Sequence, residues 1–122
     1  MQVISGIDLI EVGRVEQTIA RHGERFLRRV FTATELDQAS GRASSLAARF
    51  AAKEAAAKAL GCGIGEVGWL DLEIVLGEKR QPRLELHGAA RRMAEEQGWE
   101  SWSVSLSHTQ EHAVAVVVAV RT

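Results

Sequence analysis

Four charged side chains interrupt an alanine-rich stretch in the middle of the chain: Arg49, Lys53, Glu54 and Lys58. Residues four apart share one row of a helix, so Glu54 and Lys58 lie on one row while Arg49 and Lys53 lie on the next. The pattern predicts either a helix-stabilising Glu54–Lys58 ion pair, or a site that holds a metal ion and an anion together. The spacing alone leaves both interpretations open.

A carboxylate also interrupts the apolar segment at the start of the chain, where Asp8 lies between Ile7 and Leu9. A buried carboxylate costs free energy unless it is paired or bound to a cation. Strand alternation puts Asp8 on the side opposite Ile7 and Leu9, which allows it to face solvent. Asp8 is therefore either a surface residue or a ligand of a cation.

Hydroxyl groups and an imidazole gather near the end of the chain, at Ser105, Ser107, His108 and Thr109. Side chains of these types at a strand end could hold a phosphate group or an adenine edge. They are also typical of a turn in which Ser and Thr bond the local backbone. His108 and His112 are four apart, but they flank a turn rather than share a helix, which argues against a zinc pair.

Arginines are concentrated in the segment that follows Asp8: Arg14, Arg21, Arg25, Arg28 and Arg29. With Glu16 and Glu24 among them, they are typical of a solvated helix face. The alternative is a docking surface for an acidic partner.

The hydrophobic pattern predicts an α+β fold, an antiparallel sheet packed against helices, in the order strand, three helices, two strands, helix, two strands. The expected strands are residues 3–10, 70–76, 84–86, 102–107 and 113–120. The expected helices are a segment after Glu11 that breaks near Gly23, a short helix opened by a Thr32–Glu35 capping box, and residues 45–60 and 89–97. The apolar run 113–120 predicts a strand buried on both faces.

The composition excludes several classes of protein. With 122 residues, 46% of them hydrophobic, the chain suits one globular domain over residues 1–122. A net charge of −1 argues against a nucleic-acid partner held by bulk charge. The apolar run 113–120 is shorter than the roughly 20 residues of a membrane helix. One cysteine, Cys62, excludes an intramolecular disulfide, and without a signal peptide we expect a cytoplasmic protein.

Taken together and in order, these segments resemble one known family, the holo-acyl-carrier-protein synthases, which are the short type of 4′-phosphopantetheinyl transferase. The matching segments are Gly6-Ile-Asp8-Leu-Ile-Glu11 with Arg14, Phe31-Thr-x-x-Glu35-Leu, Arg49-Phe-Ala-Ala-Lys-Glu-Ala-Ala-Ala-Lys58-Ala-Leu-Gly61 and Ser105-Leu-Ser-His-Thr109. They span nearly the whole chain. One departure is visible: Arg80-Gln81-Pro82 stands where members often carry Gly-Lys-Pro.

The resemblance implies transfer of the 4′-phosphopantetheine arm of coenzyme A to a serine hydroxyl of an apo acyl carrier protein, with release of adenosine 3′,5′-bisphosphate. It maps the magnesium carboxylates of the family onto Asp8 and Glu54, with Glu54 and Lys58 as the catalytic pair. Mg²⁺ suits this site because it prefers oxygen ligands. The general base, either Glu54 or a water held by the metal, is left open.

The resemblance also implies a homotrimer with sites between subunits. The expected coenzyme A contacts are Arg49, Lys53, Lys58, Ser107, His108 and Thr109. The expected docking residues for the acidic carrier protein are Arg14, Arg21, Arg25 and Arg28.

Two rival functions use fewer of these features. A non-catalytic module that binds coenzyme A or a nucleotide would keep Arg49, Lys53 and His108 but would not need both Asp8 and Glu54. A protein-interaction domain would use only the arginines. The presence of both carboxylates argues against the binding module, and an interaction domain leaves the Glu54 helix and the serine–histidine segment unexplained.

Overall fold

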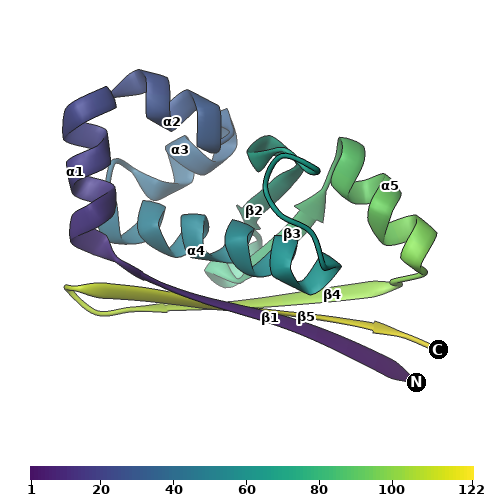
Figure 1. Ribbon diagram of the computed structural model, residues 1–122. Helices are drawn as coiled ribbons and strands as arrows, with labels where there is room; N and C mark the ends of the chain where they lie inside the picture. The colour runs from purple at the N-terminus through teal and green to yellow at the C-terminus, as the bar shows by residue number, and fades with distance from the viewer.

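The computed structural model describes residues 1–122 as an antiparallel sheet with helices packed on one side (Figure 1). The elements in chain order are β1 (Gln2–Glu11), α1 (Val12–His22), α2 (Glu24–Val30), α3 (Ala33–Ala39), α4 (Ala43–Leu60), the 3₁₀ turn η1 (Trp69–Asp71), β2 (Leu72–Leu76), the turn η2 (Glu78–Arg80), β3 (Pro82–Leu86), α5 (Gly88–Gln97), β4 (Ser101–His108) and β5 (His112–Arg121). The fold is α+β, and the predicted order is confirmed. The predicted break at Gly23 separates α1 from α2.

Helix α4 lies across the sheet whose strand order is β1-β5-β4, and β2 and β3 form a separate hairpin behind it (Figure 1). Alanines let α4 approach the sheet closely. A Cβ atom placed on Gly6 would lie 2.0 Å from the carbonyl oxygen of Ala55, so this crossing requires glycine. The close approach brings the middle of α4 against the part of β1 that carries Asp8.

The two faces of the sheet differ in burial. On β5 the inward residues Ala113, Ala115 and Val117 are buried, whereas the valines between them are only half-buried. The prediction that this strand is buried on both faces is therefore wrong within one chain, because helices cover only one side of the sheet. On β1, Ile7 and Leu9 occupy the uncovered face and are 61% and 65% exposed.

Helix ends follow the local sequence at most positions. Thr32 and Glu35 form the predicted capping box at the start of α3, and Gly61 ends α4 in the left-handed conformation. Helix α4 begins at Ala43, two residues before the predicted start, with no side-chain cap. Only residues 40–42 separate α3 from α4.

No helix of the structure combines the length and the apolar character that crossing a membrane requires.

Candidate active site

A cleft of about 600 Å³ opens where β1, α1, α2 and α4 meet, and both predicted metal-binding carboxylates line it. Asp8 comes from β1 and Glu54 from the facing side of α4. Of the two interpretations of Asp8, the structure does not support the surface position: Ile7 and Leu9 take the exposed face, and alternation turns Asp8 toward the helix, with its side chain 19% exposed. The other lining residues are Leu9, Ile10, Arg14, Val15, Thr18, Phe26, Arg29, Val30, Phe50 and Trp69.

Lys58 lies one helical turn beyond Glu54 but pairs with Asp8 instead. Its Nζ donates to Asp8 Oδ1 at 2.9 Å and to the carbonyl oxygen of Ile7 at 3.1 Å. The intrahelical ion pair between Glu54 and Lys58, one of the two interpretations of the spacing, is not formed. The Lys58 side chain is 55% exposed, so its ammonium group can still reach a ligand from solvent.

Glu54 makes no ion pair or hydrogen bond of its own within the chain. Burial raises the pKa of its carboxyl group, the Asp8 carboxylate raises it further, and Lys58 opposes both effects. Because burial and the Asp8 carboxylate disfavour the charge of Glu54, the cleft favours a proton or a cation at this carboxyl group. This arrangement suits a hard divalent cation with oxygen ligands.

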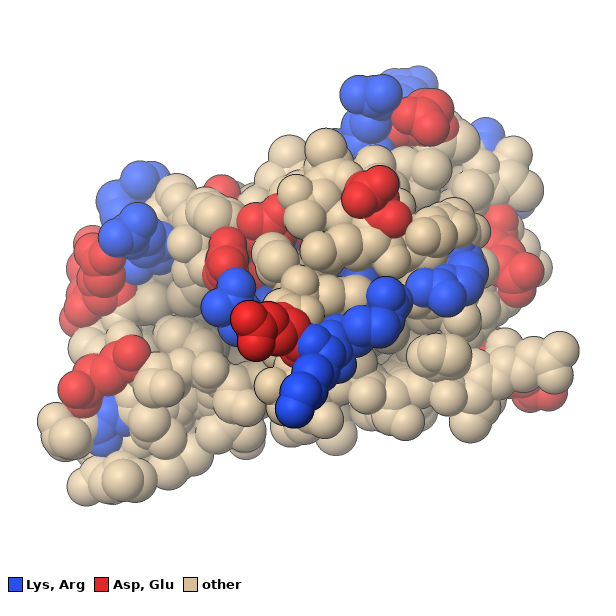
Figure 2. All heavy atoms as spheres, turned by 180° about the vertical axis from the view of Figure 1, so that it is seen from behind, with Lys and Arg blue, Asp and Glu red and all other residues tan.

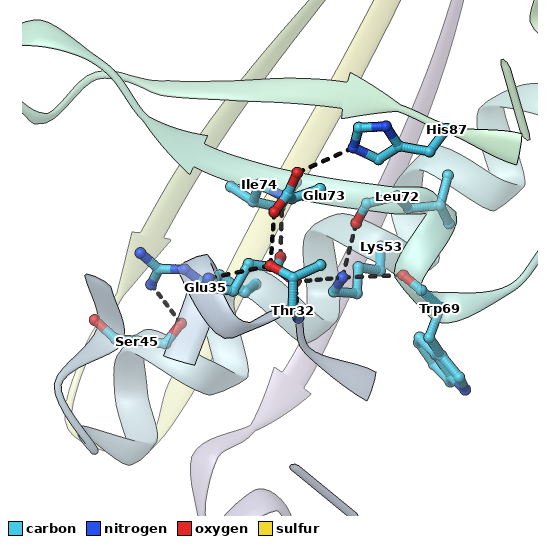
Figure 3. Close-up of polar contacts among 10 residues, drawn as sticks. Thr32, Glu35, Ser45, Lys53, Trp69, Leu72, Glu73, Ile74 and His87 are labelled. Atoms are coloured by element: carbon cyan, nitrogen blue, oxygen red, sulfur yellow. Dashed lines mark hydrogen bonds and ion pairs between the residues drawn. The ribbon is translucent and has the colours of Figure 1, made fainter. Parts of the chain in front are cut away.

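Lys53, expected to contact coenzyme A, lies on the other side of α4 and is fully buried (Figure 3). Its Nζ donates to Glu35 Oε1 at 2.8 Å, to the carbonyl oxygen of Trp69 at 3.0 Å and to that of Leu72 at 2.8 Å. An ammonium group has three donors, and all three are used. The structure therefore overturns the assignment of Lys53 to the nucleotide, because no donor is left and no surface is exposed.

Arg49 is also buried, with 3% of its surface exposed, but its bonding is incomplete. One terminal nitrogen donates to the carbonyl oxygen of Ser45 at 3.2 Å, while Nε has no hydrogen-bond partner. Burial lowers the pKa of the guanidinium, the Glu35 carboxylate opposes this, and the cations Arg42 and Arg80 lower it further. Three cations with an unpartnered donor among them favour an anion as ligand.

Arg80 reaches this group from an unusual turn between β2 and β3. Lys79 and Arg80 both adopt the left-handed conformation, with φ of 56° and 59°. That conformation costs a side-chain-bearing residue about 1 kcal/mol or more. Figure 2 shows basic side chains in a diagonal band across the face seen from behind, where this hairpin lies. Sequence reasoning identified the departure at Arg80 but missed that the charge of Arg80 acts on Arg49.

The predicted hydroxyl–imidazole group lies elsewhere in the chain. His108 and Thr109 line a hollow with the N-terminal parts of α1 and α4, and that hollow shares no residue with the Asp8–Glu54 cleft. Thr109 Oγ1 accepts from the backbone N–H groups of Glu111 and His112, as expected of a local turn. Ser107 is exposed and pairs in register with Val114 of β5. One chain therefore does not bring these residues to Glu54.

The arginines are divided among three hollows along α1 and α2. Arg14 lines the cleft and, with Arg21, a smaller neighbouring hollow. Arg25 shares a third hollow with Arg29. Arg28 lines none of these hollows, and its Nε donates to Glu24 at 2.9 Å in an exposed pair. Arg29, which was not among the expected docking residues, reaches the cleft in its place.

Comparison with known proteins identifies the family. The model of the 4′-phosphopantetheinyl transferase superfamily matches residues 5–117. A holo-[acyl-carrier-protein] synthase of Herpetosiphon aurantiacus is 47% identical over 123 residues, which cover 95% of this chain and 97% of that protein. The chain belongs to the 4′-phosphopantetheinyl transferase superfamily.

Solved structures agree with this transferase fold. The Helicobacter pylori holo-[acyl-carrier-protein] synthase in complex with coenzyme A has a TM-score of 0.88 and 34% identity, covering 96% of this chain and 100% of that one. The Bacillus anthracis holo-(acyl-carrier-protein) synthase in complex with CoA (3′,5′-ADP) has a TM-score of 0.79 and 34% identity, covering 98% and 96%. The predicted enzyme class is confirmed, and a non-catalytic module is not supported.

A second group of possible metal ligands in the transferase lies outside the cleft. Ligand atoms of Glu73, Glu85 and His87 lie within 4.8 Å of one another on the β2–β3 hairpin. Glu73 is already engaged, since Thr32 Oγ1 donates to Oε2 at 2.6 Å and the His87 ring lies 3.0 Å from Oε1 (Figure 3). These bonds connect the hairpin to α3 and give Glu73 a structural function.

The aromatic wall of the cleft is the main feature that sequence reasoning missed. Phe50 and Trp69 stack with ring centroids 4.8 Å apart, and Phe26 lies 6.4 Å from Phe50. Phe50 lies one turn before Glu54 on the same helix row, which was a usable signal. Trp69 offered none, because its position depends on the loop after α4.

Proposed function

We propose that this transferase moves the 4′-phosphopantetheine arm of coenzyme A onto a serine hydroxyl of an apo acyl carrier protein, in a Mg²⁺-dependent reaction that leaves adenosine 3′,5′-bisphosphate. The observation that carries the proposal is the pair of carboxylates, Asp8 and Glu54, in one cleft with Lys58 on Asp8. The names of the relatives and the coenzyme A in the two solved structures agree with it.

Asp8 and Glu54 are the residues that would hold the metal ion. When bound, Mg²⁺ supplies positive charge that orients the pyrophosphate and offsets the charge that builds on it. The fit rests on the donor set, since each carboxylate offers oxygen and the charge of Glu54 is disfavoured without a cation. The test is titration of the protein with Mg²⁺, in which Glu54→Gln is expected to abolish saturable binding.

The chain's own residues supply the remaining steps. The serine oxygen attacks the phosphorus that carries the pantetheine arm, and the P–O bond to the nucleotide breaks. The serine proton passes to a base in the same cleft, and the Glu54 carboxylate is the candidate that this chain offers. Lys58 can donate to the leaving pyrophosphate oxygen, because its half-exposed ammonium lies on Asp8 within the same site.

The cations around Arg49 are suited to the phosphates at the nucleotide end of coenzyme A. Arg49 keeps an unpartnered Nε, and Arg42 and Arg80 add charge. His108, Ser107 and Thr109 would complete the nucleotide site from another subunit, because the structure keeps His108 and Thr109 out of the cleft of their own chain. Arg49→Ala is expected to raise the KM for coenzyme A with little change in the KM for the carrier protein.

A homotrimer accounts for the uncovered face of the sheet. Val3, Ile7 and Leu9 are more than half exposed, and the outward valines of β5 extend this face. A contiguous apolar sheet face is typical of an interface between subunits. Light scattering is expected to give three times the chain mass. A monomer with full activity would contradict both the assembly and the shared site.

The carrier protein is expected to dock along α1 and α2. Arg14 and Arg29 line the cleft, and Arg21 and Arg25 line two hollows that share residues with it. The positive charge of these arginines suits an acidic partner and brings the partner's serine toward Glu54.

The test of the whole proposal is mass spectrometry of an apo carrier protein incubated with coenzyme A, Mg²⁺ and the enzyme. We expect the carrier mass to rise by one phosphopantetheine group and adenosine 3′,5′-bisphosphate to form in equal amount. A carrier of unchanged mass would contradict the proposal.

A further inference from the structure

We propose that Lys53 is a positioning residue of the transferase, which holds Trp69 in place as the wall of the cleft that faces Glu54. The inference rests on the proposed role of the Glu54 cleft. According to this inference, Lys53 affects kcat although its side chain contacts neither substrate.

The first support is that every hydrogen-bond donor of Lys53 has an acceptor. Its side chain is fully buried, and its ammonium group donates to Glu35, to the carbonyl of Trp69 and to the carbonyl of Leu72 (Figure 3). The three acceptors come from α3, from η1 and from the start of β2. One side chain of α4 therefore fixes three separate segments at once.

The second support is that Glu35 is equally occupied. Its Oε1 accepts the backbone N–H of Thr32 at 2.9 Å as well as Lys53, and its Oε2 accepts the N–H of Ile74 at 3.0 Å. These bonds hold the Glu35 carboxylate between the start of α3 and strand β2. Buried polar groups with every partner satisfied specify one arrangement more sharply than apolar contacts, because each bond has a direction.

The third support is the short path from Lys53 to the cleft. The Trp69 carbonyl that accepts from Lys53 belongs to the residue whose ring stacks on Phe50 at 4.8 Å. Phe50 precedes Lys53 by three residues and Glu54 follows it directly, and all of these except Lys53 line the cleft. Movement of η1 would therefore move the cleft wall relative to Glu54.

A purely structural explanation assigns the same bonds to stability alone. The two explanations differ in what happens when the charges are removed together. Replacing a buried ion pair by uncharged side chains of similar size is often tolerated by the fold. A positioning function predicts that turnover falls in such a variant although folding is kept.

The test uses Lys53→Met combined with Glu35→Gln, which removes both charges and keeps side-chain length. The matched control is Gln38→Ala. Gln38 joins α3 to β2 through two hydrogen bonds with the backbone of Leu76 and forms none with α4 or η1. Both variants are assayed in the full-length protein for thermal midpoint, kcat and the KM values for coenzyme A and carrier protein.

We expect the double variant to remain folded with kcat reduced at least tenfold and the KM for coenzyme A within twofold of wild type. We expect Gln38→Ala to keep kcat within twofold. Wild-type kcat in a folded double variant would overturn the inference, as would an equal kcat loss in Gln38→Ala.

The position of Trp69 provides a direct readout. With Trp99 and Trp102 replaced by Phe, the fluorescence of Trp69 reports its packing on Phe50. We expect the double variant to shift this emission and Gln38→Ala to leave it unchanged. An unshifted emission in the folded double variant would overturn the inference. The proposed function is tested separately, by Glu54→Gln in the same assay, which is expected to be inactive.

Discussion

Helix α4 carries a lysine on each of two sides, and the two sides differ in how many of the charged groups have partners within the chain. On the side toward α3 and β2, Lys53 is fully buried, and each of its donors has an acceptor. On the side toward β1, Lys58 is half exposed and holds Asp8, while Glu54 has no cation bonded to it.

The difference shows how structural and functional charges can be distinguished. Lys53 has no donor left for a ligand, so its charge acts through the segments that it fixes and not by contact with a substrate. The Glu54 side has unused oxygen ligands, an ammonium group open to solvent and an apolar cleft beside them. Charged groups that lack partners within the chain and lie beside a cleft indicate a ligand-binding site.

The largest expected effect is on activity when a carboxylate on the unsatisfied side is neutralised. Asp8→Asn and Glu54→Gln each keep the side-chain shape and are expected to lower kcat by about 10²–10³-fold, the usual cost of removing one group that stabilises transition-state charge. Steady-state assays with Mg²⁺ measure the loss. Glu95→Gln, which neutralises an exposed carboxylate on α5, is the control and should be fully active.

The next largest effect is the difference in the free energy of unfolding between variants of the two lysines. Lys53→Met leaves the buried Glu35 carboxylate unpaired and is expected to lower the free energy of unfolding by about 3–5 kcal/mol. Lys58→Met breaks a partly exposed pair and is expected to cost at most about 1 kcal/mol. Urea unfolding of both variants measures the difference. An equal loss of unfolding free energy in both variants would mean that burial does not determine how much each lysine contributes to stability.

The charge of Glu54 should also be visible in the pH dependence of stability. Its folded pKa is raised above its unfolded value, so the folded state binds more protons between the two values. Stability is therefore expected to fall as the pH rises through this window, which begins near the ordinary glutamate pKa of about 4.3.

Thermal unfolding with a chelator present measures this slope. Glu54→Gln should reduce the fall and raise the midpoint at neutral pH. Added Mg²⁺ should raise the midpoint of the wild type and leave that of the variant unchanged. A wild type insensitive to Mg²⁺ would contradict the cation site.

The smallest expected effect concerns the arginine surface beside the cleft. Arg14→Ala combined with Arg21→Ala should raise the KM for the carrier protein and leave the KM for coenzyme A nearly unchanged. Each exposed charge contributes up to about 1 kcal/mol, and salt should weaken the effect because the Debye length is only about 8 Å at physiological ionic strength. Arg28→Ala is the control, since Arg28 pairs with Glu24 away from the hollows. Kinetics at two salt concentrations would reject docking at this surface if all three proteins behaved alike.

The sequence by itself determined the parts of the protein that depend on local spacing. Alternation and helical periodicity gave the element order, and the Thr32–Glu35 box and Gly61 marked helix ends because capping is a local interaction. Helical spacing placed Glu54 and Lys58 on one row. The family motifs identified the enzyme class, which the comparisons confirm.

Only the tertiary structure decided which face of each element meets which neighbour. Spacing puts Arg49 and Lys53 on one helix row, but Glu35 and Trp69, which bury Lys53, come from distant segments of the chain. Alternation separates Asp8 from Ile7, but the packing of α4 on β1 decides that Asp8 faces inward. Lys58 bonds Asp8 rather than Glu54 for the same reason: contacts between remote elements form only when the whole chain packs, and no local pattern encodes them.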